Sequence, residues 1–299
     1  MSTSTPADQS SNASHMDHHH HSKLNLTDFY NDRAKNYEKG SGGVTRSVAT
    51  HIVKTHLADL PPNARVLDNA CGPAIVADEL LKIQPTASID AVDVSEGMIN
   101  VVKGLILAQG WEGKVRTDLM NGCDLRFPDQ VFDASVTNFG IFMFEPATKG
   151  ASEIYRTLKD GGVAVVTTWK RVGWRPLLAE IEKVIRPGKE SFNMPSLEKW
   201  SRKETLEDVM KSGGFQDVQV SEFETAICRL KGEEEDFAKG MAQMITGIIG
   251  EQWTEEEKQK LQGEMETVIA DKERRDRLFI EKDGVFGLEM IAFVGVGTK

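Results

Sequence analysis

The sequence predicts an α/β fold: a Rossmann-like, mostly parallel sheet of seven strands with one antiparallel edge strand, helices on both faces and helical lid insertions. Two observations support this prediction. Short apolar, β-favouring runs alternate with amphipathic helical patterns along most of the chain. In addition, a strand at 64–69 leads into a turn of small residues at 70–74 and then into a helical pattern. Open α/β sheets bind ligands at such turns, beyond the carboxyl ends of their strands.

The turn at 70–74 is suited to a close approach between backbone and ligand. Asp68 ends the preceding strand, where ligands of open α/β sheets bind. The small side chains of Ala70, Gly72 and Ala74 leave room for backbone N–H groups to reach a ligand. Each alanine adds one methyl group, which the turn can tolerate if φ stays negative.

A second strand, at 87–93, ends on another acid. Asp93 follows Gly72 by about twenty residues, the spacing expected between a nucleotide-binding turn and a ribose-binding acid. A carboxylate can accept hydrogen bonds from both ribose hydroxyls. Ser95 is the expected N-cap of the helix that follows. The two strands therefore predict a ligand that contains a ribose.

The later part of the chain provides the other strands and helices. Further strands are expected near 113–119, 132–138, 162–169, 216–229 and 287–296. Capping boxes at Ser201-x-x-Glu204 and at Thr254 to Glu257 predict two helix starts.

Composition divides the chain into three segments, a disordered tail at 1–22, an N-terminal helical cap at 23–60 and a main domain at 61–299. The tail contains four consecutive histidines, His18 to His21, which could bind a metal. Such a tract is more typical of a purification tag or a solvated segment, and we predict no metal site.

Two helical insertions lie on the main domain, at 170–200 and 232–275. We predict that both contribute to the acceptor pocket above the carboxyl ends of the strands. Met241 and Met244 lie on one face of the second insertion. Such a stripe is typical of a packed core, but methionine also suits a mobile lid over an apolar ligand.

The net charge of −10 argues against nucleic acid and anionic membranes as main partners. No apolar run approaches the roughly twenty residues of a membrane span. The three cysteines, Cys71, Cys123 and Cys228, show no C-x-x-C spacing and predict reduced thiols in a cytoplasmic protein. We expect a small-molecule partner and favour a monomer, although the oligomeric state stays open.

Four stretches, in the right order, resemble the motifs of class I S-adenosylmethionine-dependent methyltransferases. They are Asp68 to Ala74 (D-x-G-x-G-x-G), Asp93-Val94-Ser95-Glu96-Gly97-Met98 (D-[IVL]-S-x-x-M), Met120 to Asp133 (G-D-A … L-P-F-P-D … F-D) and Leu158 to Gly162 (L-K-P-G-G). The chain departs from the pattern at Ala70, Ala74 and Asn121, where the family has two glycines and an aspartate. The Asn121 side-chain carbonyl can still accept the hydrogen bond that the adenine amino group donates to that aspartate in the family, without the charge.

The resemblance implies S-adenosylmethionine as cofactor and a set of binding residues. The implied cofactor-binding residues are Tyr37, Thr45, Asp68, Ala70, Cys71, Gly72, Asp93, Val94, Met98, Asn121, Gly122, Asn138 and Phe139. The predicted substrate-binding residues are Phe142, Met143, Trp169, Trp174, Met241 and Met244.

Histidine placement bears on the reaction. Every histidine lies at or before His56, so a histidine base from the late insertions is excluded, and only His51 and His56 are candidates. An acceptor that ionises easily, such as a thiol, or a free amine, fits this absence.

The stretches Val66 to Gly72, Asp93 to Met98, Thr168-Trp169 with Trp174, and Trp253 to Glu256 together resemble fungal small-molecule methyltransferases of the gliotoxin bis-thiomethyltransferase type. That resemblance implies S-methylation in secondary metabolism. The alternatives are O- or N-methylation of a small metabolite, and a cofactor-binding cyclase or regulator that transfers no methyl group.

Overall fold

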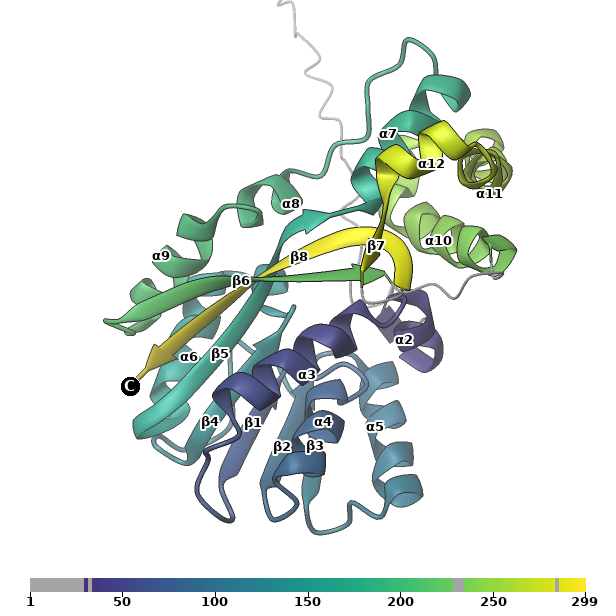
Figure 1. The fold of residues 1–299 in the computed structure, drawn as a ribbon. Coiled ribbons are helices and arrows are strands. Elements are labelled where there is room, and N and C mark those ends of the chain that lie inside the picture. Colours follow the sequence, from purple (N-terminus) through teal and green to yellow (C-terminus); the bar gives the residue numbers. More distant parts are fainter. Residues whose placement is uncertain (1–29, 32–33, 228–233, 283–284) are drawn as a thin grey trace, which may run out of the picture.

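The computed structural model describes residues 30–31, 34–227, 234–282 and 285–299 (Figure 1). The predicted tail at 1–22, with His18 to His21, lies outside the described residues, as does Cys228.

The described elements follow the predicted alternation of strands and helices. The strands are β1 (Arg65–Asn69), β2 (Ser88–Asp93), β3 (Val115–Leu119), β4 (Phe132–Asn138), β5 (Leu158–Val172), β6 (Val218–Ile227), β7 (Phe279–Lys282) and β8 (Val285–Thr298). The helices are α2 (Tyr37–Gly40), α3 (Val44–His56), α4 (Ile75–Ile83), α5 (Glu96–Gln109), α6 (Ala147–Thr157), α7 (Trp174–Ile185), α8 (Pro195–Trp200), α9 (Lys203–Gly213), α10 (Glu234–Ile249), α11 (Glu255–Ala270) and α12 (Lys272–Leu278). Short 3-10 helices are η1 (Ala34–Asn36), η2 (Ile141–Met143) and η3 (Gly250–Gln252).

One sheet runs through the molecule in the order β3-β2-β1-β4-β5-β8-β6, with β7 paired to β8 outside this path. The first five strands pair in parallel, whereas β8 is antiparallel to both β5 and β6. The predicted α/β fold with a mostly parallel sheet and an antiparallel side is confirmed. The sheet has eight strands rather than seven, because β7 forms a short hairpin with the start of β8. A four-residue strand is too brief to stand out as a sequence pattern.

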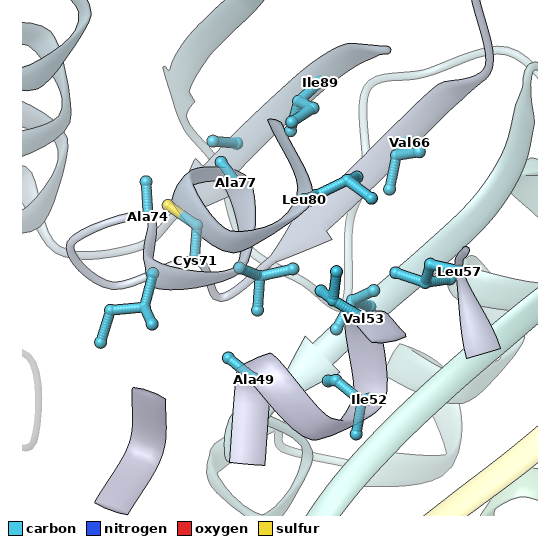
Figure 2. Close-up of a cluster of buried hydrophobic side chains, with 14 of the residues drawn as sticks. Ala49, Ile52, Val53, Leu57, Val66, Cys71, Ala74, Ala77, Leu80 and Ile89 are labelled. Atoms are coloured by element: carbon cyan, nitrogen blue, oxygen red, sulfur yellow. The ribbon is translucent and has the colours of Figure 1, made fainter. Parts of the chain in front are cut away.

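Helices α3 and α4 pack together over one face of the sheet. Figure 2 shows Ile52 and Val53 of α3, Leu80 of α4 and Val66 of β1 in one buried cluster. These side chains are fully buried. The contact fixes α3 relative to α4, because close-packed interiors resist displacement.

The opposite face of the sheet is covered by α6 and α9, which Figure 1 shows on the other side from α3. Ile154 of α6 and Leu206 of α9 are buried there against Val166 and Phe293 of the sheet. The two faces therefore give the three-layer arrangement that a parallel sheet requires.

A second hydrophobic core lies apart from the sheet centre. It combines α7 from the first insertion, α10 and α11 from the second, and the start of β8 (Figure 1). Leu177, Ile245 and Leu261 are fully buried in it. The two predicted insertions thus share one packed core.

The helix starts show one correct and one wrong capping prediction. The Thr254 hydroxyl accepts from the Glu257 N–H, and the Glu257 carboxylate accepts from the Thr254 N–H, so this capping box is confirmed. The capping box at Ser201 is wrong: α9 starts after Arg202, and the Ser201 hydroxyl donates to the Glu198 carbonyl. Ser201 is the C-cap of α8, so its side chain serves the end of that helix.

Candidate functional site

A cavity of about 580 Å³ lies where β1, β2, β3 and β4 end. All predicted cofactor residues except Asp68 are on its lining, namely Tyr37, Thr45, Ala70, Cys71, Gly72, Asp93, Val94, Met98, Asn121, Gly122, Asn138 and Phe139. Parallel strands end at the same edge of a sheet, and this brings residues about a hundred positions apart to one place.

The turn after β1 is left-handed at alternate residues. Ala70, Gly72 and Ala74 have φ angles of 56°, 54° and 57°. The condition under which the turn would tolerate alanine without strain, a negative φ, is therefore not met at either alanine. The chain must pass from β1 into α4 within five residues, and the Cys71 N–H holds the turn to β2 by donating to the Val92 carbonyl at 2.9 Å. This conformation costs a non-glycine residue about 1–2 kcal/mol.

Asp93 connects the first turn to the second. Its two carboxylate oxygens accept from the Gly72 N–H and the Ser95 N–H, each at 2.9 Å. Burial raises the pKa of Asp93, and these donors oppose the rise because they favour the ionised form. Each oxygen can accept a second hydrogen bond, so the carboxylate can still hold two hydroxyls.

Asp68 does not reach the cavity lining. It alternates with Leu67 along β1 and shares the face of Val66, which packs toward α3 and α4. Its carboxylate is buried without a side-chain hydrogen bond, and burial raises its pKa well above the ordinary value.

One end of the cavity has an apolar lining with a polar edge. Val94 and Met98 come from the start of α5, where the Ser95 hydroxyl accepts from the Met98 N–H at 3.2 Å. Asn121 stands at the edge, and its carbonyl oxygen already accepts from the Cys123 N–H at 2.8 Å. One acceptor position of the Asn121 carbonyl therefore remains for a ligand.

The other end of the cavity is built on the tip of β4. The Asn138 amide donates to the Thr45 carbonyl at 3.3 Å, and its oxygen accepts from the Thr167 hydroxyl at 2.8 Å. That hydroxyl also accepts from the Phe139 N–H at 2.9 Å. The Phe139 ring stacks on Trp169 at 3.9 Å between centroids. These contacts join α3, β4 and β5 around the cavity.

Of the six predicted substrate residues, Met143 lies on the cavity lining. Trp169 stands one layer behind, against Phe139. Phe142 packs between the two sheet-face cores. The remaining three, Trp174, Met241 and Met244, pack in the core shared by the insertions. Their side chains pack within that core because α7, α10 and α11 must bury their apolar faces against one another.

The two candidate histidine bases lie away from the cavity. His51 stacks on Phe223 of β6 at 4.0 Å, and His56 approaches His51 edge-on at 6.5 Å. Desolvation lowers the pKa of both side chains. Neither residue is on the lining, so neither is placed to accept a proton there.

The lining contains residues that the sequence analysis did not select: Tyr30, Pro73, Ile75, Val76, Ser95, Met120, Phe144 and Glu145. Phe144 is the most informative. Its ring fills the space that a side chain at Gly122 or Gly150 would occupy. The two glycines give a signal only when the fold is known, because they lie on different elements.

The donor set fits a nucleoside. Asp93 can take the ribose hydroxyls, Val94 and Met98 offer apolar surfaces to a base, and the open turn at Gly72 presents backbone to the rest of the molecule. A group of three or more His, Cys, Asp or Glu side chains that could hold a metal is absent from the described residues. Among the described helices, none has the length and apolar content needed to cross a membrane.

Comparisons with known proteins find methyltransferases. A family profile described as "Methyltransferase domain" matches residues 66–162, which contain the strand–turn–helix unit and both acids. Methyltransferase tpcH of Aspergillus fumigatus is 24% identical over 258 residues, covering 83% of this chain and 88% of that protein. A demethylmenaquinone methyltransferase of Bacteroides fragilis is 32% identical over 162 residues, covering 50% of this chain and 66% of that protein.

A solved structure shows the same fold. Phospholethanolamine N-methyltransferase 2 of Haemonchus contortus, in complex with phosphomonomethylethanolamine and S-adenosylhomocysteine, aligns with a TM-score of 0.55 and 17% identity. The alignment covers 92% of this chain and 59% of that one. The profile match and the named relatives support an S-adenosylmethionine-dependent methyltransferase, and the solved neighbour shows the same fold.

Proposed function

We propose that the chain methylates a small, partly apolar acceptor that supplies its own nucleophile, with a thiol as the first candidate. The supporting observation is the kind of titratable side chains on the described lining. They are Tyr30, Tyr37, Cys71, Asp93 and Glu145. Burial raises the pKa of Tyr37 and of Cys71, which keeps both protonated, and Asp93 is engaged by two backbone N–H groups.

A thiol needs little help from the protein. Its pKa near 8.5 leaves a reactive thiolate fraction at neutral pH. S-adenosylmethionine, when bound, would supply an electrophilic methyl group for transfer to the acceptor sulfur, with S-adenosylhomocysteine as the leaving group. The residues around Asn138 and Phe139 then have to align the two reactants and exclude water. This mechanism uses no catalytic base. The motif resemblance to the gliotoxin bis-thiomethyltransferase type, given in the sequence analysis, is the reason to try thiols first.

The proposed cofactor contacts follow the geometry. Asp93 holds the ribose hydroxyls, Val94 and Met98 flank the adenine, and Asn121 stands at its edge, while Asn138 lies beside the methionine. Asp93→Ala should abolish S-adenosylhomocysteine binding in isothermal titration calorimetry, because no other described carboxylate on the lining holds both Gly72 and Ser95. Near-normal affinity of this variant would refute the placement.

A second candidate is C-methylation of a hydroquinone-like ring. The Bacteroides fragilis relative, named a demethylmenaquinone methyltransferase, favours it. An ionised hydroquinone is also its own nucleophile, so the same lining serves both acceptors.

We further propose that the enzyme acts as a monomer without a nucleic-acid partner, which light scattering on a sizing column would test.

The deciding experiment supplies S-adenosylmethionine with a panel of thiols, hydroquinones, phenols and amines, and measures S-adenosylhomocysteine by liquid chromatography. We expect thiols to respond, with a rate that rises with the thiolate fraction between pH 6 and 9. Turnover of hydroquinones alone would select the second candidate. Efficient turnover of unactivated phenols in a His51→Ala, His56→Ala variant would contradict the proposal, because these acceptors require a base.

A further inference from the structure

Helix α2 stands on a glycine-rich turn beside the cavity. The turn, Gly40 to Gly43, joins α2 to α3, and Gly42 and Gly43 have left-handed φ angles of 59° and 78°. The helix carries Tyr37, which lies on the cavity lining. A helix of four residues is not stable by itself. Contacts outside α2 must therefore keep Tyr37 in place.

Arg46 provides such a contact, and it lies on a helix that is packed firmly in the core. It lies in the first turn of α3, a helix whose Val48, Ala49 and Ile52 are fully buried. One guanidinium nitrogen of Arg46, Nη1, donates to Asp78 and to Glu79 of α4, each at 2.5 Å. The guanidinium is therefore tied to both helices of the α3–α4 pair.

The other edge of the same guanidinium reaches α2. Arg46 Nε and Nη2 donate to the two carboxylate oxygens of Glu38, the Nη2 bond at 2.9 Å. This two-bond fork is the strongest geometry that an arginine and a carboxylate form. Glu38 is the residue next to Tyr37, so the fork acts on α2 one position from the cavity.

We propose that Arg46 is a positioning residue that holds α2 through Glu38, so that Tyr37 covers the bound cofactor and sets the rate at which the product leaves. The proposal rests on the proposed placement of the cofactor in this cavity. The Arg46 side chain is not part of the lining, although its chain neighbour Thr45 is. Arg46 acts by raising the fraction of molecules in which α2 is docked, and the apparent dissociation constant varies inversely with that fraction.

Three variants separate this role from general stability. Arg46→Met removes both the two-bond contact with Glu38 and the bonds to Asp78 and Glu79. Glu38→Gln weakens only the contact with Arg46, and the fold can lose the charge of Glu38 because this side chain is half-exposed. The matched control is Lys82→Met, because Lys82 also binds Asp78 and Glu79, at 3.2 and 2.7 Å, without touching α2. Each variant is measured for S-adenosylhomocysteine affinity by calorimetry, for its dissociation rate by stopped flow, and for thermal unfolding.

We expect Arg46→Met and Glu38→Gln to bind S-adenosylhomocysteine roughly tenfold and roughly threefold more weakly, mainly through faster dissociation. Lys82→Met should stay within twofold of the wild type. The double variant of Arg46 and Glu38 should bind no more weakly than Arg46→Met, because both changes break one contact. Raising the salt from 0.05 to 0.5 M should weaken the wild type and leave Arg46→Met unchanged.

Wild-type affinity and dissociation rate in Glu38→Gln and Arg46→Met would overturn the proposal. A loss of affinity in Lys82→Met equal to that in Arg46→Met would also overturn it, since the effect would then belong to α4. Asp93→Ala separates the two levels of inference. If Asp93→Ala loses S-adenosylhomocysteine binding while the Arg46 and Glu38 variants keep wild-type binding, the positioning role of Arg46 is refuted and the placement of the cofactor is retained. If Asp93→Ala binds normally, the placement of the cofactor fails.

Discussion

Replacing Ala70 with glycine should stabilise the protein, although the residue stands in the cofactor turn. Its φ of 56° costs an alanine about 1–2 kcal/mol relative to a right-handed conformation. Glycine removes that cost but loses about 0.5–1 kcal/mol more conformational entropy on folding. The Ala70 methyl is only partly buried, so little packing is lost. The net expectation is a gain of about 0.5–1 kcal/mol in the free energy of unfolding.

Urea unfolding and thermal unfolding measure this gain directly. For a chain of this size, about 1 kcal/mol corresponds to a rise in Tm of roughly 2–4 °C. The affinity for S-adenosylhomocysteine should be equal to the wild type or higher, because the smaller residue leaves more room for the backbone to approach the ligand.

Two nearby alanines serve as controls. Ala77 is helical and fully buried, so Ala77→Gly should cost about 2 kcal/mol, from helix propensity and one buried methyl group. Ala74 has a φ of 57° but is fully buried, so in Ala74→Gly the relief and the lost packing should nearly cancel. If Ala70→Gly loses as much stability as Ala77→Gly, the reasoning from backbone strain is wrong.

Three other predictions test separate contacts. A Cβ at Gly97 would lie 2.7 Å from the Asn31 carbonyl oxygen, so Gly97→Ala should displace Asn31 from the start of α5 and lower the affinity for S-adenosylhomocysteine at least threefold in calorimetry. The control Gly104→Ala, where a Cβ meets open space on the same helix, should keep the wild-type affinity, and equal affinities of the two variants would contradict the prediction. Hydrogen bonds from Arg156 hold the pKa of the buried Glu153 below its ordinary value, against the effect of desolvation. The unfolded state therefore binds the extra proton, and the free energy of unfolding falls as the pH drops from about 5 through the folded pKa. Glu153→Gln should make the free energy of unfolding, measured in urea titrations, less dependent on pH in this range, and an unchanged dependence would count against the assignment. Burial raises the pKa of the Cys71 thiol, so iodoacetamide should alkylate it at least tenfold more slowly in the folded protein than in the urea-unfolded protein, as followed by mass spectrometry. Bound S-adenosylhomocysteine should slow the alkylation further. Rapid labelling of the folded protein would contradict this prediction and show that the turn opens.

The sequence by itself determined the features that depend on local pattern and spacing. The strand–turn–helix unit around Gly72, the acid at Asp93 and the N-cap at Ser95 are each encoded within a few residues, and the structure places Gly72, Asp93 and Ser95 around one cavity. These features are predictable because apolar periodicity, small turn residues and caps act over short distances. The class of fold follows from the alternation of such units.

Only the tertiary structure decided the features that depend on contacts between distant elements. The left-handed φ angles of Ala70 and Ala74 arise because the turn is tied to β2 while it enters α4. Trp174 and Met241 pack in the core shared by the insertions rather than on the cavity, because their helices bury apolar faces against each other. The fork from Arg46 to Glu38, and its anchors on α4, join residues up to 33 positions apart in sequence. No local pattern specifies such pairs, because the energy of each contact exists only once the fold has brought its partners together.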